Sequence, residues 1–191
     1  MKVLVEVSAR HVHLTEEDFH LLFGEGKELT FKKSLSQPGQ FLSNERVEIA
    51  GPRGKMSNVA ILGPYRTKTQ IEVTLTDCRA LGIEAPIRES GKLEDSSPVL
   101  ITGPEGSVHK DSGLIVAKRH IHMRPEEALQ FGLHDGQTVS VEIPGRRPVC
   151  MHETVVRVSD RFALAMHIDI DEANAAGFPA NEEDVFGSVI L

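Results

Sequence analysis

Apolar and polar residues alternate along many short stretches of the chain, the period of two that is typical of β-strands with one buried face. The first such stretch is residues 3–7, where Val3, Val5 and Val7 share one side. Many short strands with Gly and Pro between them predict β-barrels rather than a parallel sheet covered by helices. The further strands are expected at residues 46–50, 58–62, 70–75, 99–102, 114–118, 138–143, 149–158 and 162–168.

Only short helices are predicted, at residues 16–23, 125–131 and 171–176. Thr15 is suited to cap the first of them, and a glycine follows each of the first two, which is a usual place for a helix to end. Residues 28–41, with a Pro-Gly pair near their centre, are predicted to form a loop. The fold class that follows is dominated by β-structure with short helices.

The tetrapeptide Arg-His-x-His occurs twice, each time after an apolar run and before an acidic stretch. His11 and His13 form one pair and His120 and His122 the other, and 109 residues separate each histidine from its counterpart. Two histidines two residues apart in a strand point to the same side, so each pair can chelate one metal ion. A single His-x-His is more often a pair of partly exposed histidines. Its duplication in register favours a metal site, expected to hold two ions.

Three more residues have an ordinary interpretation and a functional one. Glu72 lies on the polar face of the strand at residues 70–75, which is either solvated or supplies an oxygen ligand. His167 interrupts an apolar strand, where a lone histidine usually belongs to the core, although four other candidate ligands favour a metal role. Lys33 lies either in a solvated loop or in a flap that binds phosphate.

Composition and charge exclude several classes of protein. The 191 residues include 40% hydrophobic and 5% aromatic residues and no tryptophan, so the core must consist mainly of aliphatic side chains. The formal net charge of −7, without a broad basic face, argues against a nucleic-acid partner. No stretch has the apolar length of a membrane span, and no secretory signal is present, which predicts an intracellular protein. Cys78 and Cys150 fit no disulfide or zinc-knuckle pattern and are expected to be free, small buried residues.

The polar connection at residues 92–98 suggests a division of the chain, and two arrangements fit it. The chain either forms two equal halves or forms a pseudo-symmetric pair of barrels that exchange their first strands. The pattern of residues alone leaves both open.

Several motifs together resemble the phosphate propanoyltransferases of the propanediol-utilisation type. The resemblance covers nearly the whole chain. Its motifs are residues 7–14 (VSARHVHL), 35–41 (LSQPGQF), 81–83 (LGI), 85–91 (APIRESG), 119–123 (RHIHM), 166–169 (MHID) and 171–174 (DEAN).

This resemblance implies two β-barrels with an exchanged N-terminal strand, and two zinc ions between them. We expect a first barrel at residues 10–111 and a second at residues 112–191, completed by residues 1–9. The implied reaction interconverts acyl-coenzyme A and phosphate with acyl phosphate and coenzyme A. The implied site comprises His11, His13 and Glu72 for one zinc, His120, His122 and His167 for the other, Arg66 for phosphate, and Ser8, Lys33 and Asn174 near coenzyme A.

The chemistry suits these residue types. Three protein ligands per ion leave one position of zinc open, and the planar guanidinium of Arg66 matches two phosphate oxygens. We therefore expect direct attack of bound phosphate on the acyl carbonyl without an acyl-enzyme. Acetyl and propanoyl groups remain equally compatible with the sequence.

Two departures from the family pattern, and two alternatives, complete the expectations. The first strand begins at residue 3, without the encapsulation extension of microcompartment members, which favours the cytoplasm; a trimmed chain would look identical. Ala9 stands where an asparagine is expected. The alternatives are a binuclear zinc hydrolase and a non-catalytic metal-binding protein with twin barrels. Small-molecule substrates are the expected partners, with no nucleic acid and no membrane, and a homo-oligomer is left open.

Overall fold

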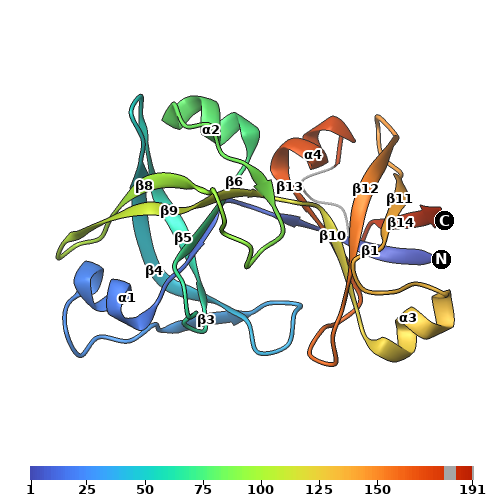
Figure 1. Cartoon of the computed structure of the whole chain (residues 1–191), viewed down its shortest axis with the longest axis horizontal. Helices are drawn as coiled ribbons and strands as arrows, with labels where there is room; N and C mark the ends of the chain where they lie inside the picture. The colour runs from blue at the N-terminus through green and yellow to red at the C-terminus, as the bar shows by residue number, and fades with distance from the viewer. Residues whose placement is uncertain (179–183, 191) are drawn as a thin grey trace. The chain divides into compact units, whose positions relative to one another are not determined.

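The structure is a computed structural model that describes residues 1–178 and 184–190, and strands dominate it (Figure 1). Its short helices are α1 (Glu16–Phe23), α2 (Leu75–Leu81), α3 (Pro125–Phe131) and α4 (Ile170–Ala175). Its strands are β1 (Lys2–Ser8), β2 (His11–His13), β3 (Phe31–Ser34), β4 (Phe41–Ala50), β5 (Lys55–Gly63), β6 (Gln70–Val73), β7 (Ile87–Arg88), β8 (Ser97–Thr102), β9 (Ser107–Ala117), β10 (His120–Met123), β11 (Thr138–Ile143), β12 (Val149–Val158), β13 (Ala165–Asp169) and β14 (Phe186–Ile190). The β-dominated fold class is confirmed.

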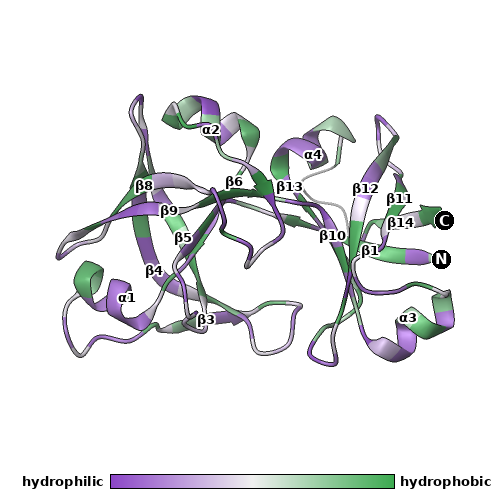
Figure 2. Ribbon diagram, viewed as in Figure 1, coloured by the Kyte–Doolittle hydropathy of each residue, from purple (hydrophilic) through white to green (hydrophobic). Residues whose placement is uncertain are grey.

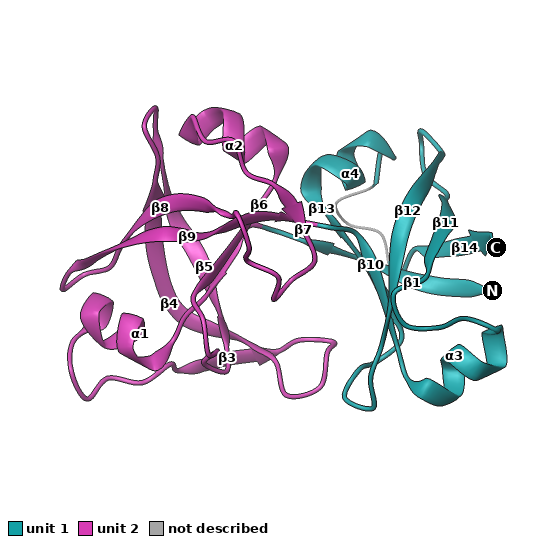
Figure 3. Ribbon diagram, in the orientation of Figure 1, with its two compact units in different colours: residues 1–9, 118–191 teal, residues 10–117 magenta. Residues whose placement is uncertain are grey.

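The chain divides into two compact units, coloured separately in Figure 3. Unit 1 combines Met1–Ala9 with Lys118–Leu191, and unit 2 is Arg10–Ala117. The predicted division into a first barrel domain at residues 10–111 and a second at residues 112–191, completed by residues 1–9, stays a prediction.

Unit 1 is a closed six-strand barrel with the order β1-β13-β10-β12-β11-β14. Strands β1 and β13 run parallel, as do β10 and β12, while the other neighbours are antiparallel. Closure satisfies the backbone hydrogen bonds that a free sheet edge would leave unpaired.

Unit 2 repeats this arrangement with different strands. Strand β8 pairs with both β4 and β9, which closes the ring β4-β5-β2-β6-β9-β8. Strands β6 and β9 are parallel, as are β2 and β5, so each pairing within this ring has a counterpart of the same direction in unit 1. Strands β3 and β7 pair only at the outside of this ring, with β4 and β9. The predicted pseudo-duplication is confirmed.

The first strand of each repeat belongs to the barrel of the other repeat. Strand β1 immediately precedes β2 in sequence but completes unit 1, and β9 immediately precedes β10 but completes unit 2. The exchange of the N-terminal strand, one of the two arrangements left open by the residue pattern, is therefore the one adopted.

Each barrel encloses its own apolar core, and Figure 2 shows hydrophobic segments along the strands. The alternation noted in the sequence explains this, because every second residue of a strand faces the inside. Completely buried side chains of the core of unit 2 include Leu14, Phe19, Ile61, Ile71 and Leu114, and those of unit 1 include Ile121, Met123, Val141, Val156 and Met166.

The helices begin directly after the strands because polar side chains cap them. Thr15 caps α1 by accepting a hydrogen bond from the backbone N–H of Asp18, and Gly24, at φ 97°, follows its end. Helices α2 and α4 each begin with a capping box, formed by Thr74 with Asp77 and by Asp169 with Glu172. As predicted, Pro125 opens α3 and Gly132 ends it.

Two hairpin turns with the sequence Gly-Pro-x-Gly, at residues 51–54 and 103–106, cap helices of unit 2. The backbone N–H of Arg53 donates to the carbonyl of Leu81, and that of Glu105 donates to the carbonyl of Leu22, each at 3.0 Å. A side chain on Gly51 would place its Cβ 2.5 Å from the Leu81 oxygen, so this turn requires glycine for close approach.

Several sequence-based expectations were wrong, and α2, β7 and β14 were not predicted. Residues 31–34 form β3 inside the predicted loop, because pairing with β4 stabilises a strand whose side chains are all exposed. The strand predicted to reach residue 75 ends at Val73, since the capping box starts α2 there. Cys150 is exposed on β12, whereas Cys78 is buried as expected. None of these changes moves a candidate metal ligand, but Lys33, predicted to lie in a loop, lies on β3.

Candidate metal centres

His11 and His13 lie on β2 in unit 2, and Glu72 faces them from β6. The strands are antiparallel and place the Cα of His11 directly opposite that of Glu72. Nε2 of His11 lies 3.5 Å from Oε2 of Glu72, and the two imidazole centroids are 4.9 Å apart. One possible ligand atom from each of the three residues lies within 4.8 Å of the others. We call these residues the Glu triad.

The surroundings of the Glu triad favour the neutral form of His13 and the ionised form of Glu72, which are the forms that can bind a metal ion. His13 is 3% exposed, and its Nδ1 lies 3.3 Å from the carbonyl of Leu62, so Nδ1 can donate while Nε2 stays free. Burial, followed by the charges of His11 and Arg66, lowers the pKa of His13 well below its usual value. Burial by itself would raise the pKa of Glu72, but the charges of His11 and His13 and other contacts outweigh it and lower that pKa to about 2.

A hydrogen-bonded chain joins Arg66 to Glu72. Nη1 of Arg66 donates to Oγ of Ser90 at 3.2 Å. Nε2 of Gln70 lies 2.8 Å from Oγ of Ser90 and 2.5 Å from Oε1 of Glu72, and it can donate to both oxygens. The backbone N–H of Gly91 donates to Oε1 of Gln70 at 2.8 Å and fixes the amide. Arg66, predicted as the phosphate ligand, is therefore positioned beside the Glu triad.

Gln70 and Ser90 were not predicted as site residues. Gln70 shares the polar face of its strand with Glu72, which was the available signal. Ser90 lies in a motif of the family resemblance but 20 residues away from Gln70 in sequence, so only the fold brings the two together.

His120 and His122 lie on β10 in unit 1, and His167 faces them from β13. The Cα of His120 is directly opposite that of His167. The centroid distances are 4.5 Å for His120 and His122, 5.1 Å for His120 and His167, and 5.0 Å for His122 and His167. Ligand atoms of these residues also lie within 4.8 Å of one another. We call them the His triad.

Neighbouring groups orient two of these imidazoles and leave an unsatisfied nitrogen on the third. Nδ1 of His120 lies 2.9 Å from the carbonyl of Lys118, and Nδ1 of His167 lies 3.6 Å from Oε2 of Glu6. Nδ1 of His122 is buried and has no hydrogen-bond partner among the described residues. Burial, followed by the charges of His120, His167 and Arg157, lowers the pKa of His122 to about 2. A buried neutral imidazole without a partner is costly unless a metal ion accepts its lone pair.

Both triads fit zinc as judged by their donors. Zinc in proteins takes neutral imidazole nitrogens and carboxylate oxygens, and sites with three protein ligands keep a fourth position for substrate. The orphaned nitrogen of His122 and the oriented ring of His13 agree with this chemistry. The sequence-based prediction that both triads belong to one dinuclear centre stays a prediction.

The arginine before each histidine pair forms an ion pair with an acidic residue of a helix. In each unit, this helix follows the strand that carries the third residue of the triad. Arg10 donates to both carboxylate oxygens of Asp77, through Nε at 3.0 Å and Nη2 at 2.7 Å. Nη1 of Arg119 lies 3.1 Å from Oε1 of Glu172. Both acids also complete the capping boxes of their helices. Each ion pair therefore connects the start of the strand that carries two histidines, β2 or β10, to the first turn of α2 or α4.

The residues predicted near coenzyme A lie in both units. Ser8 ends β1 in unit 1, and its Cα pairs with that of Asp169, the cap of the helix that carries the exposed Asn174. Lys33 is exposed on β3 of unit 2. Their contact with coenzyme A stays a prediction.

Within the described ranges, no helix has both the length and the apolar character needed to span a membrane.

Comparisons with known proteins agree with these features. The family model for phosphate propanoyltransferase matches residues 4–179. A phosphate propanoyltransferase of Enterococcus faecalis is 53% identical over 173 residues, which are 91% of this chain and 82% of the relative. The enzyme of the same name from Clostridioides difficile is 52% identical over 174 residues, 91% of this chain and 83% of the relative, and that from Leptotrichia buccalis is 51% identical over 175 residues, 92% and 83%. The chain therefore belongs to the phosphate propanoyltransferase family, a family of acyltransferase enzymes.

Proposed function

We propose that the protein transfers an acetyl or propanoyl group between coenzyme A and inorganic phosphate, with zinc held by the Glu triad and the His triad. The position of Arg66 carries the proposal, because a permanently charged guanidinium lies beside a group of metal-binding side chains. Membership of an acyltransferase family supports the reaction type.

The protein's own residues would position phosphate for attack. Arg66 offers two parallel donors to phosphate oxygens, and its bond to Ser90 limits the directions in which the guanidinium can point. Phosphate is already an anion near neutral pH, so the attack depends on positioning more than on a protein base. Gln70 holds Ser90 and Glu72 together, which couples the phosphate ligand to a metal ligand.

The bonds balance without an acyl-enzyme. A phosphate oxygen forms a bond to the acyl carbonyl carbon, the carbon–sulfur bond breaks, and the proton of hydrogen phosphate ends on the coenzyme A thiol. When bound, zinc would supply Lewis-acid stabilisation of the oxygen charge and of the departing thiolate. Cys78 is buried in the core of unit 2 and cannot serve as a nucleophile there.

Release of free thiol from acetyl- or propanoyl-coenzyme A tests the proposal directly. We expect release to require inorganic phosphate and to produce one acyl phosphate for each thiol. A binuclear hydrolase would release thiol equally well without phosphate, and a non-catalytic metal-binding protein would release none. Either result would overturn the proposal.

The cytoplasmic location predicted from the sequence stays a prediction.

A further inference from the structure

An arginine lies beside the His triad, on the strand next to the histidine pair. Strands β10 and β12 are parallel, and the Cα of His122 pairs with that of Arg157. Directly paired residues of neighbouring strands point to the same side of a sheet, so the Arg157 side chain shares the side of His122. Arg157 is half-buried rather than extended into solvent.

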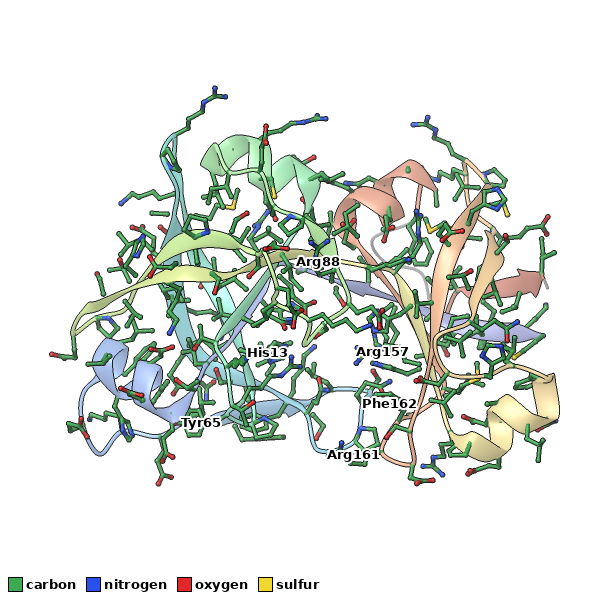
Figure 4. All side chains as sticks on the ribbon, viewed as in Figure 1. His13, Tyr65, Arg88, Arg157, Arg161 and Phe162 are labelled. Atoms are coloured by element: carbon green, nitrogen blue, oxygen red, sulfur yellow. The ribbon has the colours of Figure 1, made fainter. Side chains whose placement is uncertain are left out.

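An aromatic ring connects this arginine to the triad. The guanidinium carbon of Arg157 lies 5.8 Å from the centroid of the Phe162 ring, which in turn stacks on the His122 imidazole at 4.0 Å. Figure 4 shows Arg157 and Phe162 next to each other. The aromatic contact limits the motion of the arginine stem and leaves the donors of the guanidinium available.

The charge of Arg157 is not neutralised by a carboxylate in residues 1–178 and 184–190. Glu6, an acid beside the His triad, lies near His167 instead. The ion pairs of unit 1 in these residues join Lys118 to Glu153, Arg119 to Glu172, Arg124 to Glu126 and His167 to Glu6. A half-buried cation beside the three histidines favours an anionic ligand, more so once a divalent ion is bound.

We propose that Arg157 binds a phosphoryl group of a substrate at the His triad. This inference rests on the proposed function, in which inorganic phosphate and coenzyme A both carry phosphoryl oxygens. A planar guanidinium suits such oxygens because it can donate two parallel hydrogen bonds. Arg157 thus gives unit 1 an anion ligand of its own, as Arg66 does for unit 2.

Binding measurements on the zinc-loaded full chain test this role separately from turnover. Arg157→Met keeps the apolar stem on Phe162 and removes the charge. The matched control is Arg161→Met, which removes an exposed arginine four residues away. Equilibrium dialysis would measure the dissociation constants for inorganic phosphate and for coenzyme A, after zinc content and thermal unfolding show that each variant is loaded and folded.

We expect Arg157→Met to raise the dissociation constant of one of these ligands by about tenfold to a hundredfold, the value of a charge-assisted hydrogen bond. Arg161→Met should change neither dissociation constant. Weaker binding of phosphate alone would identify phosphate as the ligand, and weaker binding of coenzyme A alone would identify its phosphoryl groups. Unchanged affinity for both, or an equal loss in Arg161→Met, would overturn the inference.

A second variant keeps the test decisive if Arg157→Met folds poorly. Arg157→Lys retains the charge but not the planar fork, so we expect an intermediate affinity, with wild-type affinity contradicting bidentate binding. Failure of the proposed function would look different, because the wild-type protein would then release thiol without phosphate, or release none, whatever residue stands at position 157.

Discussion

The two units share one barrel topology and one register around their candidate metal ligands, but they differ in the residue that completes each triad. His11 faces Glu72 in unit 2, and His120 faces His167 in unit 1. The position of the third ligand is therefore duplicated while its chemistry is not. A carboxylate lowers the charge of one site, and a third imidazole leaves the other more positive.

The nearby arginines differ in the same way. Arg66 comes from a loop before β6 and is fixed by Ser90, whereas Arg157 comes from a strand and packs against Phe162. Duplication thus explains where the candidate metal ligands lie, while the surroundings of the two triads differ. Substitutions made in pairs, one in each unit, test how far this correspondence extends.

The largest expected effect comes from removing one histidine of each triad. Elemental analysis should find about two zinc equivalents per chain, one for each set of three donors. His11→Ala and His120→Ala should each lose about one equivalent and reduce phosphate-dependent thiol release to background. His20→Ala, outside both triads, is the control and should keep both ions. Retention of both ions after changing His11 and His120 together would overturn the ligand assignment.

Removal of Arg66 should have the next largest effect. Arg66→Ala should keep zinc and fold but raise the KM for phosphate by roughly tenfold to 150-fold, the equivalent of about 1.5–3 kcal/mol for a hydrogen bond to a charged group. Steady-state kinetics with varied phosphate would measure this change. Arg79→Ala, on the exposed face of α2, is the matched control. Wild-type kinetics in Arg66→Ala would remove Arg66 from its proposed role.

Replacing the third residue of each triad by its counterpart in the other triad tests most directly whether the positions of Glu72 and His167 are equivalent. Glu72→His and His167→Glu should keep both zinc equivalents, because either side chain can ligate from that position. Zinc affinity should fall by about tenfold to a hundredfold, since contacts such as that of Gln70 with Glu72 are lost. Competition with a chelator would measure the affinity. Complete loss of one ion in either variant would show that the two positions are not interchangeable.

The arginines that precede the histidine pairs should contribute unequally to stability. Arg10→Ala leaves Asp77, whose side chain is 3% exposed, without its cation, and should cost roughly 2–3 kcal/mol. This is below the range for a fully buried pair because the Arg10 side chain is 41% exposed. Arg119→Ala should cost about 0.5–1 kcal/mol, because Glu172 is 22% exposed. Urea unfolding would compare them, and equal losses would contradict this difference.

The smallest effects are expected at the cysteines. Cys150→Ser, at an exposed position, should change stability by less than about 0.5 kcal/mol. Cys78→Ser places a hydroxyl in the core of unit 2 and should cost about 1–2 kcal/mol. Both variants should keep phosphate-dependent thiol release. Loss of release in a folded, zinc-loaded Cys150→Ser protein would argue for a covalent intermediate.

The sequence predicted those features that depend on local periodicity. Alternation placed His11 and His13 on one side of a strand, and a cap residue followed by glycine correctly bounded α1. Prediction failed where pairing with a neighbouring strand decides the outcome, as for β3, whose side chains are all exposed and which is stabilised by pairing with β4. The hydrogen bonds that connect Arg66 through Ser90 to Gln70 could likewise not be predicted, because they join residues up to 24 positions apart.

By itself, the sequence determined the β-rich class, the doubled histidine pairs and their resemblance to a known family, because these follow from residue type and short spacing. Apart from what that resemblance implied, only the tertiary structure decided which barrel receives β1 and which strand faces each histidine pair. The physical reason is that strand pairing is made by backbone hydrogen bonds, which carry little information about residue type. Local pattern therefore specifies that a strand forms, and the closure of each barrel selects its neighbours.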